Sequence, residues 1–313
     1  MDWKDISHCI AVPFYNRTEQ VKICLSKLIK QALPFTKILL LNDGSDETFN
    51  IQDYNDERIF MISHSSNIGI GAARNSIIKW CRENKIEIVI MIDSDCLPLD
   101  GFVEEHLKLH YNDSEAACYG GGIIGIGKGF WAKVDGIMSW VHSIPQGGEK
   151  EVKEPYLLPG TNISFKVSCF EDKKKVFNDR LLTGEDALLI RNLRKKGKKI
   201  MFSSKPKIHH KDRDNFKDVV KHSYIWGGHL YLIQFGNNFS KTALKLSRRI
   251  LFCIFFLVLS PFFVLSGSIF TMVPWLKIRV NTLKYFPVII LLWIVKVWAI
   301  FRVAINPKKH MVY

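Results

Sequence analysis

The first part of the chain alternates short, continuous apolar runs with longer segments in which apolar residues recur every three or four positions. The apolar runs cover residues 8–13, 37–41, 59–63 and 86–92, and the helical spacing occupies residues 18–32 and a segment that ends near Cys81. Continuous runs of this length are typical of strands buried on both faces, and periodic segments are typical of the helices that cover them. The order predicts an α/β fold, with a mostly parallel sheet and helices on both faces.

Polar side chains follow three of these strands at the point where each strand ends. The three clusters are Tyr15 with Asn16, residues 42–46, and Asp93, Ser94 and Asp95. Because ligands of open α/β sheets bind beyond the carboxyl ends of the strands, we expect the clusters to converge on one pocket. The two aspartates are suited to share a divalent cation there, although an isolated Asp-x-Asp is equally typical of a solvated turn.

Glycines mark two further segments. Gly69 and Gly71 precede a helix, but the third glycine of a dinucleotide-binding fingerprint is missing, so they are weak evidence for a Rossmann site. Arg74, near the start of that helix, either meets a phosphate at the helix amino terminus or lies on a solvated face. Residues 120–156 show no clean periodicity, and we interpret their glycines and charges as flexible connections beside the site.

Acids and histidines recur in the second half of the chain. Glu185 and Asp186 precede apolar residues in helical register, which places them in the first turn of a helix, where acids also occur merely as caps. Short strands over 199–208 end at His209 and His210. Since neighbouring side chains of a strand point to opposite faces, at most one of these histidines faces the site, to contact a metal ion or a phosphate.

The amino-acid composition indicates which kinds of partner and which cellular compartment to expect. The chain has 44 lysines and arginines against 30 acids, a net charge of +14, which indicates an anionic partner such as membrane lipid, nucleic acid or nucleotide phosphate. The seven cysteines show no CxxC pair, which favours reduced thiols packed inside an intracellular protein. Because the amino terminus has no basic region followed by a long apolar segment, we expect no secretory signal and a cytoplasmic first domain.

Two long apolar segments, residues 250–273 and 286–305, divide the chain into a first domain of residues 1–240 and a membrane-associated segment of residues 241–313. At about 1.5 Å per residue, each segment forms a helix long enough to cross a hydrocarbon core of about 30 Å. Lys296 lies inside the second segment, where a lysine is costly unless it pairs or reaches the interface. Two arrangements remain open: a spanning hairpin, which we favour, and shallow insertion at the cytoplasmic face.

Basic residues flank both apolar segments. Lys241, Lys245, Arg248 and Arg249 precede the first, Lys277, Arg279 and Lys284 connect the two, and Lys308 and Lys309 follow the second. The positive-inside tendency therefore places the first domain at the cytoplasmic face of the cell membrane. Since anionic lipid attracts each such residue by about 1 kcal/mol, the surplus of positive charge needs no nucleic-acid partner.

Seven short motifs, in this order, resemble those of the family 2 glycosyltransferases, the large inverting class with the GT-A fold. They are VPFYN at 12–16, NDGSDE at 42–47, NIGIGAARN at 67–75, DSD at 93–95, PGTN at 159–162, GED at 184–186 and a terminal histidine at 209 or 210. The resemblance covers about residues 7–235. Asn42 stands where the family often has an aspartate, which leaves the identity of the donor nucleotide open.

The resemblance implies a role for each candidate residue. Asp93 and Asp95, with His209 or His210, would bind Mg²⁺ or Mn²⁺ at the donor diphosphate. Asp186 would be the general base, and Glu185 would support it. The remaining candidates would bind the donor: Asp43 at the nucleoside, Pro13, Tyr15 and Asn16 along its pocket, Arg74 near the base or phosphates, and Ser94 between the two metal-binding aspartates.

The leading interpretation is a metal-dependent, inverting transfer of a sugar from a nucleotide-sugar donor to an acceptor hydroxyl, in lipid-linked or cell-surface glycan synthesis. One alternative is a polyprenyl-phosphate glycosyltransferase, which resembles this layout and has little need of a base because its acceptor is already an anion. An alternative of another class is a non-catalytic membrane scaffold that retains the fold. The expected partners are a nucleotide sugar, a glycan or lipid-linked acceptor and membrane lipid, without nucleic acid.

Overall fold

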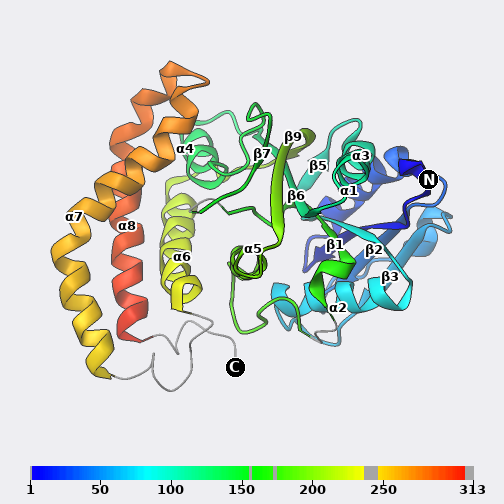
Figure 1. Ribbon diagram of the computed structural model, residues 1–313, viewed down its shortest axis with the longest axis horizontal. Coiled ribbons are helices and arrows are strands. Elements are labelled where there is room, and N and C mark those ends of the chain that lie inside the picture. Colours follow the sequence, from blue (N-terminus) through cyan, green and yellow to red (C-terminus); the bar gives the residue numbers. More distant parts are fainter. Residues whose placement is uncertain (1, 155–156, 172–174, 236–245, 307–313) are drawn as a thin grey trace.

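The computed structural model describes residues 2–154, 157–171, 175–235 and 246–306, and Figure 1 shows its sheet on one side and three long helices on the other. Nine strands form one sheet in the order β3-β2-β1-β4-β8-β6-β9-β5, and β7 pairs with β9. The strands are β1 His8–Phe14, β2 Lys37–Asn42, β3 Ile59–Ser63, β4 Ile88–Ile92, β5 Cys96–Pro98, β6 Ala116–Gly125, β7 Glu149–Glu151, β8 Asn162–Lys166 and β9 Lys199–His210. The α-helices are α1 Thr18–Gln31, α2 Ile70–Glu83, α3 Phe102–Asn112, α4 Phe130–Ser139, α5 Glu185–Lys195, α6 Phe216–Phe235, α7 Leu246–Leu276 and α8 Phe286–Ile305.

The half of the sheet formed by β1 to β4 is parallel, and it is buried on both faces. Along β1, Cys9 and Ala11 belong to the core under α2 and α5, whereas Ile10 and Val12 belong to the core under α1 and α3. This alternation explains why the strands read as continuous apolar runs. The predicted α/β fold with helices on both faces is therefore confirmed.

The other half of the sheet is mixed. Strand β8 runs antiparallel to both β4 and β6, β9 runs parallel to β6, and β5 and β7 run antiparallel to β9. The interpretation of residues 120–125 as a flexible connection is wrong, since they form the end of β6 in the middle of the sheet. Their glycines serve close packing: a Cβ at Gly121 would lie 2.5 Å from the Pro206 carbonyl oxygen, and a Cβ at Gly122 would lie 3.0 Å from Pro145.

The carboxyl-terminal part forms the predicted pair of apolar helices. α7 continues through Pro261 and Gly267, and α8 coincides with the expected segment 286–305. Both are long and apolar enough to cross a membrane by length and composition. The domain boundary near residue 240, Lys241, Lys245, Lys308 and Lys309 lie outside the described residues, as do the side chains of Arg248 and Arg249.

Candidate active site

The Asp-Ser-Asp turn links β4 to β5, and its two aspartates face different partners. Asp93 directly follows β4, and its carboxylate accepts hydrogen bonds from the Thr161 hydroxyl at 2.9 Å and from the Arg74 guanidinium at 3.2 Å. Asp95 directly precedes β5 and forms an ion pair with Arg17. Each carboxylate is about one-quarter to one-third exposed, so both remain open to a ligand.

Arg74 joins the Asp93 side of this turn to helix α5. Its buried guanidinium forms ion pairs with Asp93 and with the buried Glu185. Burial raises the pKa of Glu185, and the Arg74 charge opposes that shift. A Cβ at Gly160 would lie 2.5 Å from an Arg74 nitrogen, so the backbone at this glycine rests against the guanidinium. Arg74 is thus not on a solvated face, and it holds two carboxylates together.

Asp186 is placed by the turn that also carries Gly160 and Thr161. Its Oδ2 accepts a hydrogen bond from the Gly160 backbone N–H at 2.6 Å, and its Oδ1 accepts one from the Ala187 N–H at 2.7 Å. Gly184, with a φ of +84°, turns the chain into α5 directly before the two acids. The turn at residues 159–162 therefore brings the aspartate at the end of β4 and the acids at the start of α5 into one cluster.

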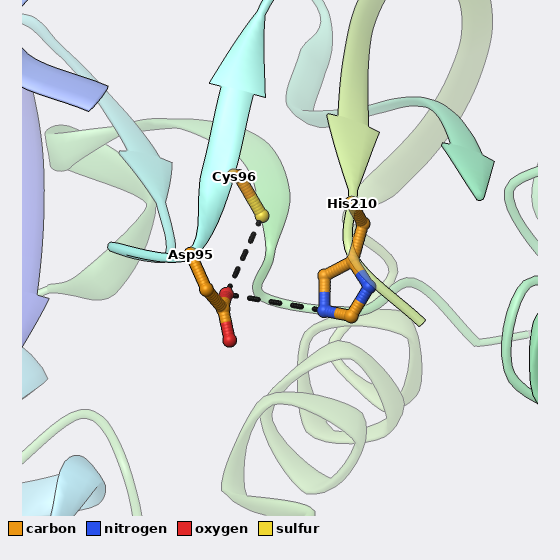
Figure 2. Close-up of side chains that lie close together, drawn as sticks. All are labelled: Asp95, Cys96 and His210. Carbon is orange, nitrogen blue, oxygen red and sulfur yellow. Dashed lines mark hydrogen bonds and ion pairs between the residues drawn. The ribbon is translucent and has the colours of Figure 1, made fainter. Parts of the chain in front are cut away.

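The register of β5 against β9 brings His210 close to Asp95. Because β5 runs antiparallel to β9 with Cys96 opposite His210, the imidazole Nε2 lies 3.8 Å from Oδ1 of Asp95 (Figure 2). Cys96 Sγ lies 3.7 Å from the same oxygen, and the ligand atoms of the three residues all lie within 4.8 Å of one another. Burial raises the pKa of Cys96 well above its ordinary value, so its thiol stays protonated and donates to Asp95.

A second carboxylate orients His210. Asp212 Oδ1 accepts hydrogen bonds from the Trp140 indole at 2.8 Å and from the His210 Nδ1 at 3.2 Å. Gly125 and Gly136 leave room for this carboxylate, since a Cβ at Gly136 would lie 2.9 Å from its Oδ2. Burial lowers the pKa of His210, but Asp212 and Asp95 outweigh that effect and the pKa is raised. With Nδ1 bonded to Asp212, Nε2 is the nitrogen that faces Asp95.

The ends of β1 and β2 meet at the other side of the site. The Asn16 backbone N–H donates to the Ser45 hydroxyl at 2.9 Å, and the Asn16 side-chain oxygen accepts from the Asp46 N–H at 2.8 Å. Asp43 is buried and accepts hydrogen bonds from the Gly69 N–H at 3.0 Å and from His64 at 2.7 Å. Asp43 therefore fastens the loop before α2 to the end of β2.

The remaining expected residues are placed as follows. Pro13 is buried within β1, Tyr15 is exposed just beyond it, and Ser94 is buried between the two aspartates. His209 lies outside the group formed by Asp95, Cys96 and His210. Sequence reasoning assigned no role to Arg17, Thr161, Trp140 or Asp212. The only signal for Asp212 was a carboxylate two residues after a histidine, and the only signal for Thr161 was the PGTN motif.

The donor set fits a divalent ion at Asp95 and His210. Carboxylate oxygen and imidazole nitrogen converge there, and both atoms belong to side chains oriented by other groups. Mg²⁺ strongly prefers oxygen ligands, whereas imidazole also suits transition ions. Asp93 lies outside this group, and Arg74 already compensates its charge.

Comparison with known sequences gives one family. The profile of glycosyl transferase family 2 matches residues 9–174, just over half of the chain. The uncharacterized glycosyltransferase EpsJ of Bacillus subtilis is 39% identical over 84 residues, which are 26% of this chain and 24% of EpsJ. WfgD of Escherichia coli, a UDP-Glc:alpha-D-GlcNAc-diphosphoundecaprenol beta-1,3-glucosyltransferase, is 22% identical over 113 residues, which are 36% of this chain and 44% of WfgD. The matches thus span less than half the length of these relatives.

Comparison with solved structures gives the fold. TarS 1–349 of S. aureus superposes with a TM-score of 0.54 at 18% identity, covering 97% of this chain and 91% of that one. The mannosyltransferase PcManGT of Pyrobaculum calidifontis, solved with GDP-Man and Mn²⁺, superposes with a TM-score of 0.53 at 13% identity, covering 74% of this chain and 64% of that one. The GT-A fold expected from the motifs is confirmed.

Proposed function

The chain belongs to glycosyl transferase family 2, and from this premise we propose that it transfers a sugar from a nucleotide-sugar donor to an acceptor hydroxyl, with inversion and with a divalent cation. The observation that carries the proposal is the joining of Asp93 to Asp186 through residues 160 and 161. Thr161 donates to Asp93 at 2.9 Å while the neighbouring Gly160 N–H donates to Asp186 at 2.6 Å. A donor-facing aspartate and a proton acceptor therefore belong to one rigid unit.

Asp186 acts as the general base in this proposal. Glu185 forms a buried ion pair with Arg74, whereas Asp186 is 8% exposed and accepts hydrogen bonds from two backbone N–H groups. The Asp186 carboxylate takes the proton of the acceptor hydroxyl. The acceptor oxygen then forms a bond to the anomeric carbon on the face opposite the diphosphate, the bond from that carbon to the diphosphate oxygen breaks, and the nucleoside diphosphate leaves.

Asp95 and His210 hold the ion, with Mn²⁺ favoured by the imidazole donor. Bound there, the ion neutralises the charge of the departing diphosphate. The presence of Mn²⁺ in the PcManGT complex supports the choice of metal. Asp93 and Ser94 face the donor beside it, with Arg74 holding Asp93 in position.

The nucleoside binds at the ends of β1 and β2. Tyr15 is exposed there and is available to a base, and Asn16 is fixed by Ser45 and Asp46. Pro13 shapes the end of β1, and Asp43 keeps the loop before α2 in place so that the pocket is closed on that side. Binding measurements with a panel of UDP and GDP sugars identify the donor nucleotide.

The acceptor is a lipid-linked glycan at the cytoplasmic face of the membrane. WfgD acts on a diphosphoundecaprenol-linked sugar, and the two apolar helices supply a means for this chain to meet such an acceptor at the bilayer. The basic residues that flank those helices in the sequence favour the anionic inner leaflet.

The Asp186→Asn variant tests the proposal. We expect it to bind the donor with Mn²⁺ as tightly as the wild type in calorimetry, and to lose transfer by about 10²-fold or more, the usual contribution of a general base. Asp100→Asn, an exposed carboxylate before α3, is the matched control and should leave both properties unchanged. Near-normal turnover of Asp186→Asn on a hydroxyl acceptor would remove Asp186 from this role.

Two other outcomes identify the alternatives. Transfer to a polyprenyl phosphate that survives Asp186→Asn would indicate a polyprenyl-phosphate glycosyltransferase, because a phosphate oxyanion attacks without a base. Failure of the wild type to bind any nucleotide sugar in the presence of Mn²⁺ or Mg²⁺ would support a non-catalytic scaffold.

A further inference from the structure

Helix α8 lies between α6 and α7 (Figure 1), and α6 packs against one side of it. Near the amino-terminal end of α8, Ile289 belongs to an apolar cluster with Val219 of α6. Near its carboxyl-terminal end, Val303 belongs to a second cluster with Leu232 of α6. One side of the second apolar helix is therefore packed against the first domain, while its other side exposes residues such as Trp298.

The middle of α8 is joined to the first domain as closely as its ends. A Cβ at Gly227 of α6 would lie 2.5 Å from Cα of Lys296, so the two backbones are in contact there. The Lys296 ammonium lies 4.9 Å from the centre of the Trp293 ring of the same helix. Lys296, which is costly in a lipid-facing helix, thus has its backbone against α6 of the domain.

Helix α6 is in turn tied to the helices of the sheet domain. His222 Nδ1 lies 3.1 Å from the carboxylate of Asp135 in α4, and Arg191 of α5 donates to the Ile233 carbonyl oxygen at 3.1 Å. Gly184, before α5, lets the chain approach Ile233 so closely that a Cβ there would lie 2.8 Å from its side chain. If α8 crossed a bilayer, α6 and the charged surfaces of α4 and α5 would have to enter the lipid with it.

The outer surface of α7 is a continuous apolar stripe. Seven of its exposed apolar residues recur at spacings of three and four and so share one face of the helix, and exposed Ile254 and Leu257 widen the apolar surface beside it. We call this the α7 stripe, and it consists of Leu251, Phe255, Val258, Phe262, Leu265, Ile269 and Val273. A stripe this long needs an apolar partner, since isolated exposed apolar residues are ordinary but contiguous ones mark a contact surface.

Charge indicates which partner this is. The connection from α7 to α8 exposes Lys277, Arg279 and Lys284, and the described part of that connection contains no acid. Basic residues in the connection between two apolar helices are attracted to the surface of an anionic bilayer and oppose transfer of that connection across it.

We propose that the α7–α8 hairpin lies in the plane of an anionic bilayer surface, with the α7 stripe in the lipid, and does not span the membrane. This inference rests on the membrane association in the proposed function and replaces the spanning hairpin favoured by the sequence. Leu188 of α5 belongs to the same apolar cluster as Val303, so the helix that carries Asp186 is held at a fixed position relative to the lipid surface. A lipid-linked acceptor would reach the base without leaving the membrane.

Sidedness distinguishes the in-plane hairpin from the spanning one. Asn281→Cys lies in the exposed connection between the helices, and Asp100→Cys lies on the sheet domain as its matched reference. Both are made in a Cys253→Ala background, because the other six cysteines are buried. In sealed membrane vesicles of one orientation, an impermeant maleimide should label both positions or neither. Labelling of the two positions from opposite sides would overturn the proposal.

The stripe is tested with vesicles of phosphatidylglycerol and phosphatidylcholine. Val258 is 74% exposed in the stripe, and Phe35 is 78% exposed on the sheet domain. Val258→Asp should weaken vesicle binding by about tenfold or more, while Phe35→Asp should leave it unchanged. Equal effects, or a stripe occupied by a second copy of the chain in solution with no vesicle binding, would refute the in-plane contact. If the wild type transfers sugar to a soluble acceptor but binds no vesicles, only the membrane part fails and the catalytic proposal stands.

Discussion

Asp93 and Asp95 are two residues apart, yet the protein holds them by opposite means. Asp93, which we call the inner aspartate, pairs with buried Arg74, which also binds Glu185, and the Thr161 hydroxyl fixes its second oxygen. Asp95, the outer aspartate, pairs with half-exposed Arg17 and lies near His210. The two carboxylates are similarly exposed, at 33% and 26%, but the cation on the inner side belongs to a dry ion pair with Glu185, and the cation on the outer side is open to solvent.

The difference separates two tasks within one Asp-x-Asp motif. Buried charges are costly unless each has its partner, so the inner ion pairs have one stable arrangement. Exposed charges interact weakly and exchange partners with little change in free energy. The inner side therefore suits the fixed placing of Asp93 against the donor and beside the neighbouring Asp186, and the outer side suits the binding and release of an ion with its diphosphate.

The largest expected effect comes from removing the inner cation. Arg74→Ala leaves Glu185 buried with an unpaired charge, which should lower the free energy of unfolding by about 3–5 kcal/mol, as for other broken buried pairs. Urea denaturation measures this. Arg74→Ala with Glu185→Gln should recover part of the loss, because the uncompensated charge is gone. A loss below about 1 kcal/mol for Arg74→Ala would show that the inner ion pair is not dry.

The second-largest expected effect is a fall in the free energy of unfolding at acid pH, caused by a buried histidine of α3. His106 of α3 is buried beside Asn162 and Ser164 of β8, and burial lowers its pKa to about 4. Because the unfolded chain takes up this proton below pH 6.5 and the folded one only near pH 4, stability should fall as pH drops through that window. The cost is about 3 kcal/mol for a pKa that falls from 6.5 to about 4.

Thermal denaturation between pH 7 and pH 4 checks this slope. His106→Gln should flatten it, and the control His209→Gln, whose side chain has no part in the buried contacts of α3, should leave it unchanged. His110 and His142, whose pKa values burial lowers to about 3 and about 4, would account for a residual slope below pH 6.5. A His106→Gln profile identical to that of the wild type would contradict the assignment.

The first half of the sheet follows from local pattern more directly than either side of the site does. Continuous apolar runs define β1, β2 and β4, and their polar ends mark where ligands meet. The Asp95–His210 contact depends on the register of β5 against β9, two strands more than a hundred residues apart, which no local pattern encodes. The glycines of β6 mislead for the same reason, because they are selected by neighbours such as Asn162 that only the fold brings near.

The position of the apolar helices is likewise not encoded by local pattern. Length and hydropathy are identical for a helix that crosses a membrane and one that lies against a domain. The contacts of α8 with α6 are the observations from which the in-plane arrangement is proposed.

A smaller effect is expected on the outer side when His210 loses its orienting carboxylate. Asp212→Asn should weaken Mn²⁺ binding by about 10–100-fold, the usual effect of removing a group that holds a metal-bound histidine. Calorimetry of the nucleotide-free protein measures the affinity, and the ¹⁵N shifts of the His210 ring report its tautomer. Asp214→Asn, an exposed acid in the same segment, is the control. An unchanged affinity for Asp212→Asn would place the ion away from His210.

The smallest effect should come from Arg17, the exposed counterpart of Arg74. Because its side chain is 52% exposed, Arg17→Ala should change the free energy of unfolding by less than about 1 kcal/mol. The same change removes a positive charge that competes for the Asp95 carboxylate, so Mn²⁺ should bind about two- to fivefold more tightly, and more so at low salt. Arg17→Lys keeps the charge and should behave like the wild type. If Arg17→Ala instead destabilises the protein as much as Arg74→Ala does, the outer side is as rigid as the inner one, and the division of tasks between the two aspartates fails.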